Sequence, residues 1–288
     1  MLFSPPAWGQ QTSLSQPSED IINAVIAGDW SFVRSKSIEW VSRDSRSAVA
    51  MLLADTATSV TRDFDGRFKA LSYYDYPYSD PKALEKLTEW VNSLLRSNEK
   101  NENILILMST LQMKGYKNIT EATQIFEQAR NLSPDNEYVL INLGNSYGSN
   151  NRTQEARDIF ENVLKKNTAS AGALNGLGMI AMSRKDMAEA ATMFEKAVKT
   201  KGVGPMEYFN LGSLYYHQKR FQAACQLLEK AVVLSPKMID ARFNLAGIYY
   251  TLQRKQDCIE QLKIIVEIDS TSTTGTRAKN NLSSFGVK

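Results

Sequence analysis

Histidine and cysteine are scarce in this chain of 288 residues. There is one histidine, His217, and there are two cysteines, Cys225 and Cys258. No spacing such as H-x3-H or C-x2-C occurs, which excludes a zinc site built from the usual ligands. The chain also lacks the phosphate-binding loop, the nucleophile turn and the zinc-protease motif that mark common enzyme families. We therefore expect no metal, no cofactor and no catalytic residue.

Long apolar runs and clusters of one charge are absent as well. No stretch approaches the roughly 18 apolar residues that span a bilayer, so we expect no transmembrane segment. The 34 basic and 31 acidic side chains leave a net charge of +3. Basic residues form no run longer than a pair, such as Lys165 and Lys166. Because nucleic-acid binding usually needs a concentrated basic patch, we expect no nucleic acid among the partners.

The first 17 residues leave two interpretations open. Small residues, Ala7 and Gly9, occupy the two places that a signal peptidase reads, and a polar stretch follows. However, a basic region and an apolar run of about 7–15 residues are missing. The segment is either the remnant of an export signal, in a periplasmic or secreted protein, or a disordered N-terminus of a cytoplasmic one.

A period of 34 residues organises the rest. The phrase FNLGSLYY at residues 209–216 returns as FNLAGIYY at residues 243–250, and counting from Asn103 gives five units without a gap. Positions 4, 7, 8 and 11 share one face of a first helix, and positions 20, 24 and 27 share one face of a second. Position 8 holds Thr110, Gly144, Gly178, Gly212 and Ala246, position 20 holds Ala122, Ala156, Ala190, Ala224 and Cys258, and position 24 holds Phe126, Phe160, Phe194, Leu228 and Leu262. Each unit is thus a helical hairpin that its neighbours must cover.

This pattern resembles the tetratricopeptide repeat from Asn103 to about Ser270. It departs at position 4, where the family favours tryptophan and none of the five units has one. The resemblance implies an all-α, right-handed superhelical solenoid of helix-turn-helix repeats. We expect residues 1–17 to be the N-terminal segment, 18–102 two degenerate helical hairpins, 103–270 five repeats, and 271–288 a polar C-terminal cap.

The resemblance also implies a concave groove lined by positions 2, 5, 6, 9, 12 and 13 of the first helices. Aromatic, methionine and amide side chains dominate there, and Lys114 and Asp240 carry its only charges. The residues predicted to bind a peptide are Tyr138, Asn142, Asn145, Asn175, Met179, Phe209, Asn210, Tyr216, Phe243, Asn244 and Tyr250. Three of them, Asn142, Asn210 and Asn244, resemble the asparagine ladder in the repeat domain of O-linked N-acetylglucosamine transferase. An amide side chain can donate to a peptide carbonyl and accept from a peptide amide.

These observations predict a non-enzymatic scaffold or adaptor that binds an extended segment of another protein in its groove. An alternative is a regulatory or substrate-binding module of an enzyme complex, such as a transferase or a cell-envelope machine. Self-association through the N-terminal hairpins is a further possibility. The polar tail after residue 270 is expected to contain a short capping helix that keeps the last repeat soluble.

Overall fold

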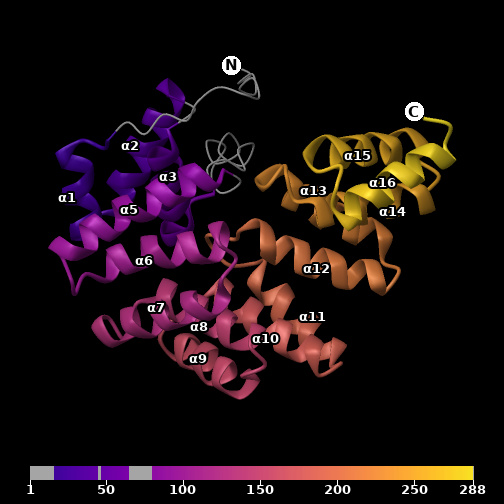
Figure 1. The fold of residues 1–288 in the computed structure, drawn as a ribbon. Helices are drawn as coiled ribbons and strands as arrows, with labels where there is room; N and C mark the ends of the chain where they lie inside the picture. Colours follow the sequence, from indigo (N-terminus) through magenta and orange to yellow (C-terminus); the bar gives the residue numbers. More distant parts are fainter. Residues whose placement is uncertain (1–15, 45–46, 65–79, 288) are drawn as a thin grey trace.

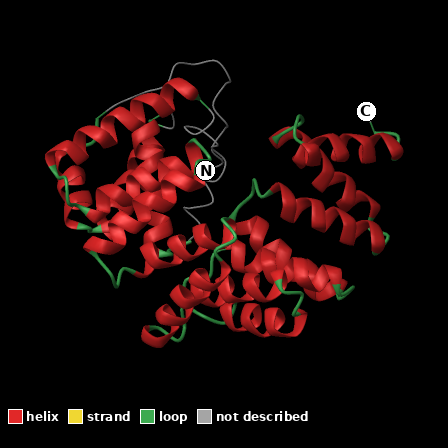
Figure 2. Ribbon diagram, turned by 60° about the horizontal axis from the view of Figure 1, so that its bottom comes forward, coloured by secondary structure: helices red, strands yellow, loops and turns green. Residues whose placement is uncertain are grey.

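The structure, a computed structural model, describes residues 16–44, 47–64 and 80–287. The candidate export segment at residues 7–9 and the tyrosine-rich segment at residues 73–78 lie outside these residues. The described chain folds into fifteen α-helices and one π-helical turn (Figure 2). No helix among them is long and apolar enough to cross a lipid bilayer. The predicted all-α solenoid is confirmed.

The helices follow one another along a curved array (Figure 1). They are α1 (Glu19–Ala27), α2 (Trp30–Arg43), α3 (Ala48–Thr61), α5 (Pro81–Ser97), α6 (Glu102–Thr110), α7 (Ile119–Leu132), α8 (Glu137–Ser149), α9 (Thr153–Lys166), α10 (Ala171–Ser183), α11 (Met187–Ala197), α12 (Pro205–His217), α13 (Phe221–Leu234), α14 (Ile239–Thr251), α15 (Lys255–Ile268) and α16 (Thr273–Ser284), and the π-helical turn η1 (Leu111–Gly115) continues α6. From α6 onwards the helices pack in pairs, and α16 packs on α15 at the end.

The turn inside each hairpin has a left-handed residue at the same position in all five repeats. The residue at position 15 is left-handed, with φ between 54° and 63°, although it is never glycine. These residues are Lys117, Asn151, Lys185, Lys219 and Gln253. Positive φ is uncommon outside glycine, so its return every 34 residues indicates that the hairpins turn alike, although the first does so after the π-helical turn η1. Arg62, with φ of 52°, ends α3 in the same way.

Small residues at position 8 lie against the large side chain at position 24 of the same repeat. A Cβ on Gly144 would lie 2.6 Å from the Phe160 ring, and one on Gly178 would lie 2.4 Å from the Phe194 ring. Phe160 also covers Gly176 of the next repeat, where a Cβ would come within 2.3 Å. Both phenylalanines are almost completely buried. Because interiors are close-packed, the glycines are needed to admit these rings.

A polar clasp joins successive repeats. Tyrosine at position 11 donates its hydroxyl to glutamate at position 25 of the preceding repeat, and arginine at position 16 stacks on the tyrosine ring. The clasps are Tyr147–Glu127–Arg152, Tyr215–Glu195–Arg220 and Tyr249–Glu229–Arg254, with hydroxyl–carboxylate distances of 2.7, 2.6 and 2.9 Å and guanidinium–ring distances of 3.8, 3.7 and 4.4 Å. Ala181 and Asp186 replace the tyrosine and arginine in the third repeat, where Arg157 instead donates to Glu189 at 3.0 Å.

The N-terminal helices associate differently from the expected hairpins. Two hairpins in residues 18–102 would pair α1 with α2 and α3 with α5, whereas α2 packs most extensively on α3, and α1 also contacts α6. The reason lies in how apolar each helix is. Ten of the residues of α3 are buried, so it takes contacts on every side, while α1 buries only Ile21 and Val25.

The core divides into two large clusters that meet within α10. The first runs from Ile21 to Ile180 and the second from Ala181 to Leu282. The second includes Ala278 and Leu282 of α16, so this last helix covers the apolar face of the fifth repeat.

The contact of Gly178 with Phe194 gives a test of the register. Gly178→Leu should lower the free energy of unfolding by about 1–3 kcal/mol, because the added side chain enters a filled space. Gly148→Ala is the matched control, since a Cβ there meets nothing within 4 Å and alanine favours a helix by about 1 kcal/mol. Chemical denaturation of the three proteins measures both effects. A Gly178→Leu protein as stable as the parent would contradict the packing described.

Candidate functional site

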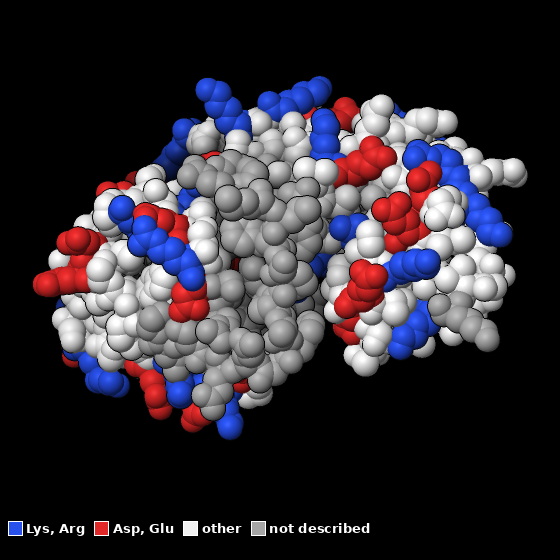
Figure 3. Space-filling view, turned by 90° about the horizontal axis from the view of Figure 1, so that it is seen from above, with Lys and Arg blue, Asp and Glu red and all other residues white. Residues whose placement is uncertain are grey.

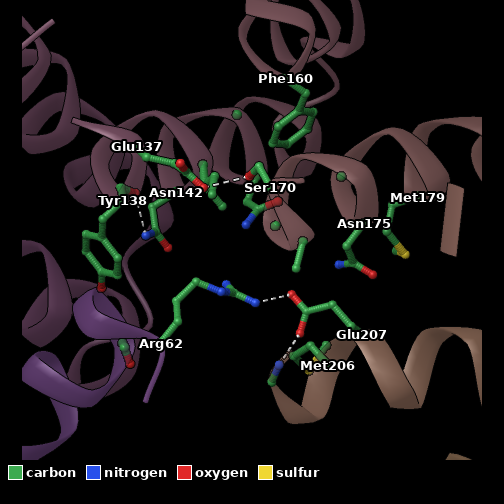
Figure 4. Close-up of a pocket in the computed structure, with 18 of the residues that line it drawn as sticks. Arg62, Glu137, Tyr138, Asn142, Phe160, Ser170, Asn175, Met179, Met206 and Glu207 are labelled. Carbon is green, nitrogen blue, oxygen red and sulfur yellow. Dashed lines mark hydrogen bonds and ion pairs between the residues drawn. The ribbon is translucent and has the colours of Figure 1, made fainter. Parts of the chain in front are cut away.

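A cavity of about 1200 Å³ lies on the concave side of the array. Its walls come from the end of α3, from η1, from α8 and α10, and from the start of α12. Figure 4 shows these walls converging on a space between Tyr138, Asn175 and Glu207. The first helices of the repeats thus supply most of the wall, as the repeat pattern predicts.

The structure divides the predicted site residues into two groups. Those that line the cavity are Tyr138, Asn142, Asn145, Asn175, Met179 and Asn210. Those on the same helical faces of the fourth and fifth repeats, but outside the cavity lining, are Phe209, Tyr216, Phe243, Asn244 and Tyr250. The structure thus brings six of the predicted residues to one cavity and leaves the other five on α12 and α14.

The amide side chains in the cavity are oriented by hydrogen bonds within the protein. Asn142 donates its Nδ2 to the carbonyl oxygen of Tyr138 at 2.8 Å. Asn210, which is buried, donates its Nδ2 to Oδ1 of Asn175 at 2.9 Å. This arrangement leaves Oδ1 of Asn142 as an acceptor and Nδ2 of Asn175 as a donor (Figure 4). Together they offer the complement of one peptide group.

The asparagine ladder is only partly available to a ligand. Asn244 donates its Nδ2 to Oγ of Ser213 at 3.0 Å, so its donor is also used within the protein. The ladder is interrupted in the third repeat by Gly176, because the Phe160 ring occupies the space of a side chain there. Asn175, one residue earlier, takes over the polar position in the cavity.

The aromatic residues of the last two repeats are more involved in packing than the sequence suggested. Phe209 and Phe243 are half-buried and pack against the C-terminal core cluster. The guanidinium of Arg277, on α16, lies 4.5 Å from the centre of the Phe243 ring. Both phenylalanines therefore contribute to packing within the array, and Phe243 is also covered by a side chain of α16.

The two tyrosines in the same part of the array differ in exposure. The hydroxyl of Tyr216 lies over α14, where a Cβ on Gly247 would come within 2.8 Å of it. Tyr250 is 65% exposed and meets the Phe285 ring edge-on, with 6.0 Å between the centres. Tyr250 is thus the more accessible of the two.

Ion pairs hold two of the basic side chains that line the cavity. Lys114 contacts Asp55 of α3 at 2.7 Å, and Arg62 contacts Glu207 of α12 at 2.7 Å. Sequence reasoning missed Arg62 and Glu207. Arg62 precedes the regular repeats, and position 3, which Glu207 occupies, is not a groove position in the family pattern.

Charges of both signs are interspersed over the face shown in Figure 3. Within the described parts of the chain, no three histidine, cysteine or acidic side chains are placed to hold a metal ion. The polar lining of the cavity includes amides, hydroxyls and paired charges, and Met179 and Met206 add flexible apolar side chains.

Family comparisons agree with the repeat geometry. The tetratricopeptide repeat model matches residues 141–205. This chain is a tetratricopeptide repeat protein. A second model, that of anaphase-promoting complex, cyclosome, subunit 3, matches residues 183–264. Proteins with these repeats generally serve as protein–protein interaction modules and are generally non-catalytic. Comparison with curated proteins gives no match.

Solved structures share the fold at low sequence identity. The crystal structure of yeast Tom70 aligns with a TM-score of 0.56 and 13% identity, over 98% of this chain and 66% of that one. The structure of TTC0263, a thermophilic tetratricopeptide repeat protein in Thermus thermophilus, aligns with a TM-score of 0.53 and 16% identity, over 63% of this chain and 99% of that one. These similarities concern the fold alone.

Tyr138 is half-buried in the wall of the cavity, with its hydroxyl near Thr110 and Asp55, and its ionisation makes the stability of the protein depend on pH. Loss of water around its hydroxyl, together with the nearby charge of Asp55, raises its pKa to about 12. The unfolded chain deprotonates this group near pH 10. The stabilisation from neutral Tyr138 is therefore complete below about pH 10 and is lost as the pH rises towards 12.

Tyr138→Phe should remove this dependence. The parent protein should lose more unfolding free energy than the variant between about pH 9 and about pH 12, as measured by denaturant titration. Tyr147, Tyr215 and Tyr249 also have raised pKa values, but they are present in both proteins and cancel in the comparison. Parallel stability curves for the two proteins would argue against a desolvated hydroxyl at this position.

Proposed function

We propose that this protein is a non-enzymatic adaptor that binds an extended segment of another protein in the cavity between η1, α8, α10 and α12. The observation that carries the proposal is the fixed pair of amides, with an acceptor on Asn142 and a donor on Asn175. A peptide backbone presents both partners at every residue except proline. Because internal hydrogen bonds already orient the two amides, little side-chain freedom is lost on binding.

Methionine side chains favour the same kind of ligand. Met179 and Met206 line the cavity and are 47% and 48% exposed. Methionine is flexible and adapts to differently shaped apolar groups. A segment with its backbone on the amides would therefore place small or medium apolar side chains against these two residues.

The ion pairs in the cavity wall indicate the net charge of the segment that the cavity would bind. Lys114 is neutralised by Asp55, and Arg62 by Glu207. A strongly acidic segment would find few basic side chains that are not already in an ion pair. A strongly basic segment would have to displace Lys114 or Arg62 from its carboxylate. We therefore propose that the bound segment is extended and close to neutral.

Selection of short random peptides displayed on phage, followed by calorimetry on a selected peptide, tests this proposal. Asn142→Ala combined with Asn175→Ala should weaken binding at least about tenfold, since anchor losses often exceed 1.4 kcal/mol. Asn244→Ala is the matched control, because it removes a similarly bonded amide outside the cavity. Circular dichroism should show unchanged helix content in all variants.

Two results would count against the cavity as the binding site. One is an unchanged affinity in the Asn142→Ala, Asn175→Ala protein. The other is a larger loss in Asn244→Ala than in that double variant, which would move the site to the fourth and fifth repeats.

A further inference from the structure

The repeat is interrupted at the end of α11. In four repeats the second helix ends at position 30, namely at Leu132, Lys166, Leu234 and Ile268. By contrast, α11 ends at Ala197, which is position 27. The connection to α12 is residues 198–204, longer than the one at residues 133–136, and it contains Gly202 with φ of 67°. Its backbone groups are therefore available to contacts from elsewhere in the chain.

Arg62, at the end of α3, makes those contacts. Its Nε donates to the carbonyl oxygen of Gly202 at 2.8 Å, and its NH2 group donates to Oε1 of Glu207 at 2.7 Å. Arg62 and Glu207 are 145 residues apart in the sequence. The other carboxylate oxygen of Glu207 accepts from the backbone N–H of Gly204 at 2.9 Å, and the residue is 4% exposed.

The end of α3 is itself held in place on both sides. Arg34 of α2, whose side chain is 5% exposed, contacts the Asp63 carboxylate at 3.0 Å and its carbonyl oxygen at 2.7 Å. On the other side, the Phe64 ring lies against the loop, where a Cβ on Gly204 would be 3.0 Å from it. These contacts fix the end of α3, from which the Arg62 side chain extends to α12.

We propose that the contacts of Arg62 with Gly202 and Glu207 form a latch that closes the cavity across its width, and that a peptide enters after the latch opens. This inference rests on the proposed function. In a solenoid each repeat ordinarily contacts its neighbours, whereas the latch joins α3 directly to α12. Figure 4 shows the Arg62 side chain reaching across the cavity to Glu207.

The two partners of the latch differ in exposure. The Arg62 side chain remains 26% exposed and that of Glu207 is 6% exposed, so separation of the pair depends on water reaching the Glu207 carboxylate, since a buried charge without a partner is costly. When the pair separates, Glu207 gains water and keeps its hydrogen bond from Gly204. The N-terminal turn of α12 therefore survives opening, and the helices on either side move as intact units.

Labelling of a cysteine placed in the cavity measures access without any peptide. Met179→Cys puts an accessible thiol on the cavity wall. The native Cys225 and Cys258 are buried, and burial raises the pKa of Cys225 to about 11 and that of Cys258 above its usual range. Because the thiolate is the reactive form, they react slowly at neutral pH, and the parent chain serves as the blank.

The latch variants are made in this Met179→Cys protein. Arg62→Met removes the cation, and Glu207→Gln removes the charge while its amide oxygen can still accept from Gly204. Both should react about fivefold faster with a maleimide on a branched polymer, as expected for loss of a partly exposed ion pair, and equally fast with iodoacetamide. Arg43→Met is the matched control, since Arg43 pairs with Glu39 within α2.

The latch proposal is overturned if Arg62→Met and Glu207→Gln both react with the polymer-maleimide at the same rate as the parent Met179→Cys protein. The adaptor proposal and the latch proposal can each be contradicted without the other. Peptide binding without an effect of the latch variants would leave the adaptor function standing, and faster labelling without any peptide selected would leave the latch standing alone.

Discussion

The ring of Phe160 lies over the backbones of two first helices at once, and the shape of the cavity depends on it. Gly144 of α8 and Gly176 of α10 both face this ring at distances that leave no room for a Cβ. The separation of α8 from α10 is therefore set by the thickness of an aromatic ring. Because these two helices form the centre of the cavity wall, the positions of Asn142 and Asn175 follow from the same contact.

Much of the fold could be predicted because the information is local. The 34-residue period located the hairpins from α6 to α15, since each repeat is buried by its immediate neighbours. The helix α5 is local in the same sense, because its buried residues Leu84, Leu87 and Val91 recur at helical spacing after a proline at its first turn. The association of α2 with α3 could not be predicted in this way. It depends on which of several apolar faces meet, and α3 buries ten of its residues rather than a single stripe.

The candidate site was predictable in composition but not in detail. Family positions placed Asn142, Asn175 and Met179 correctly in the cavity lining. They did not reveal which amide groups are used up by internal hydrogen bonds, because that depends on side-chain orientation. The contact of Arg62 with Glu207 spans 145 residues and has no counterpart in the repeat pattern. The one sequence feature that pointed to this contact was the presence of Gly202 and Gly204 just before α12.

The division of the core within α10 has a consequence for how the molecule comes apart. The two apolar clusters meet at Ile180 and Ala181, and the same repeat lacks the tyrosine that would clasp it to its predecessor. Solenoid stability is a sum of repeat terms and neighbour interfaces, so a boundary between apolar clusters marks where cooperative blocks would divide. We therefore expect denaturant or force to unfold the array in two steps, divided within α10. The contact of Arg62 with Glu207, which joins the first block to the second, would couple these two steps.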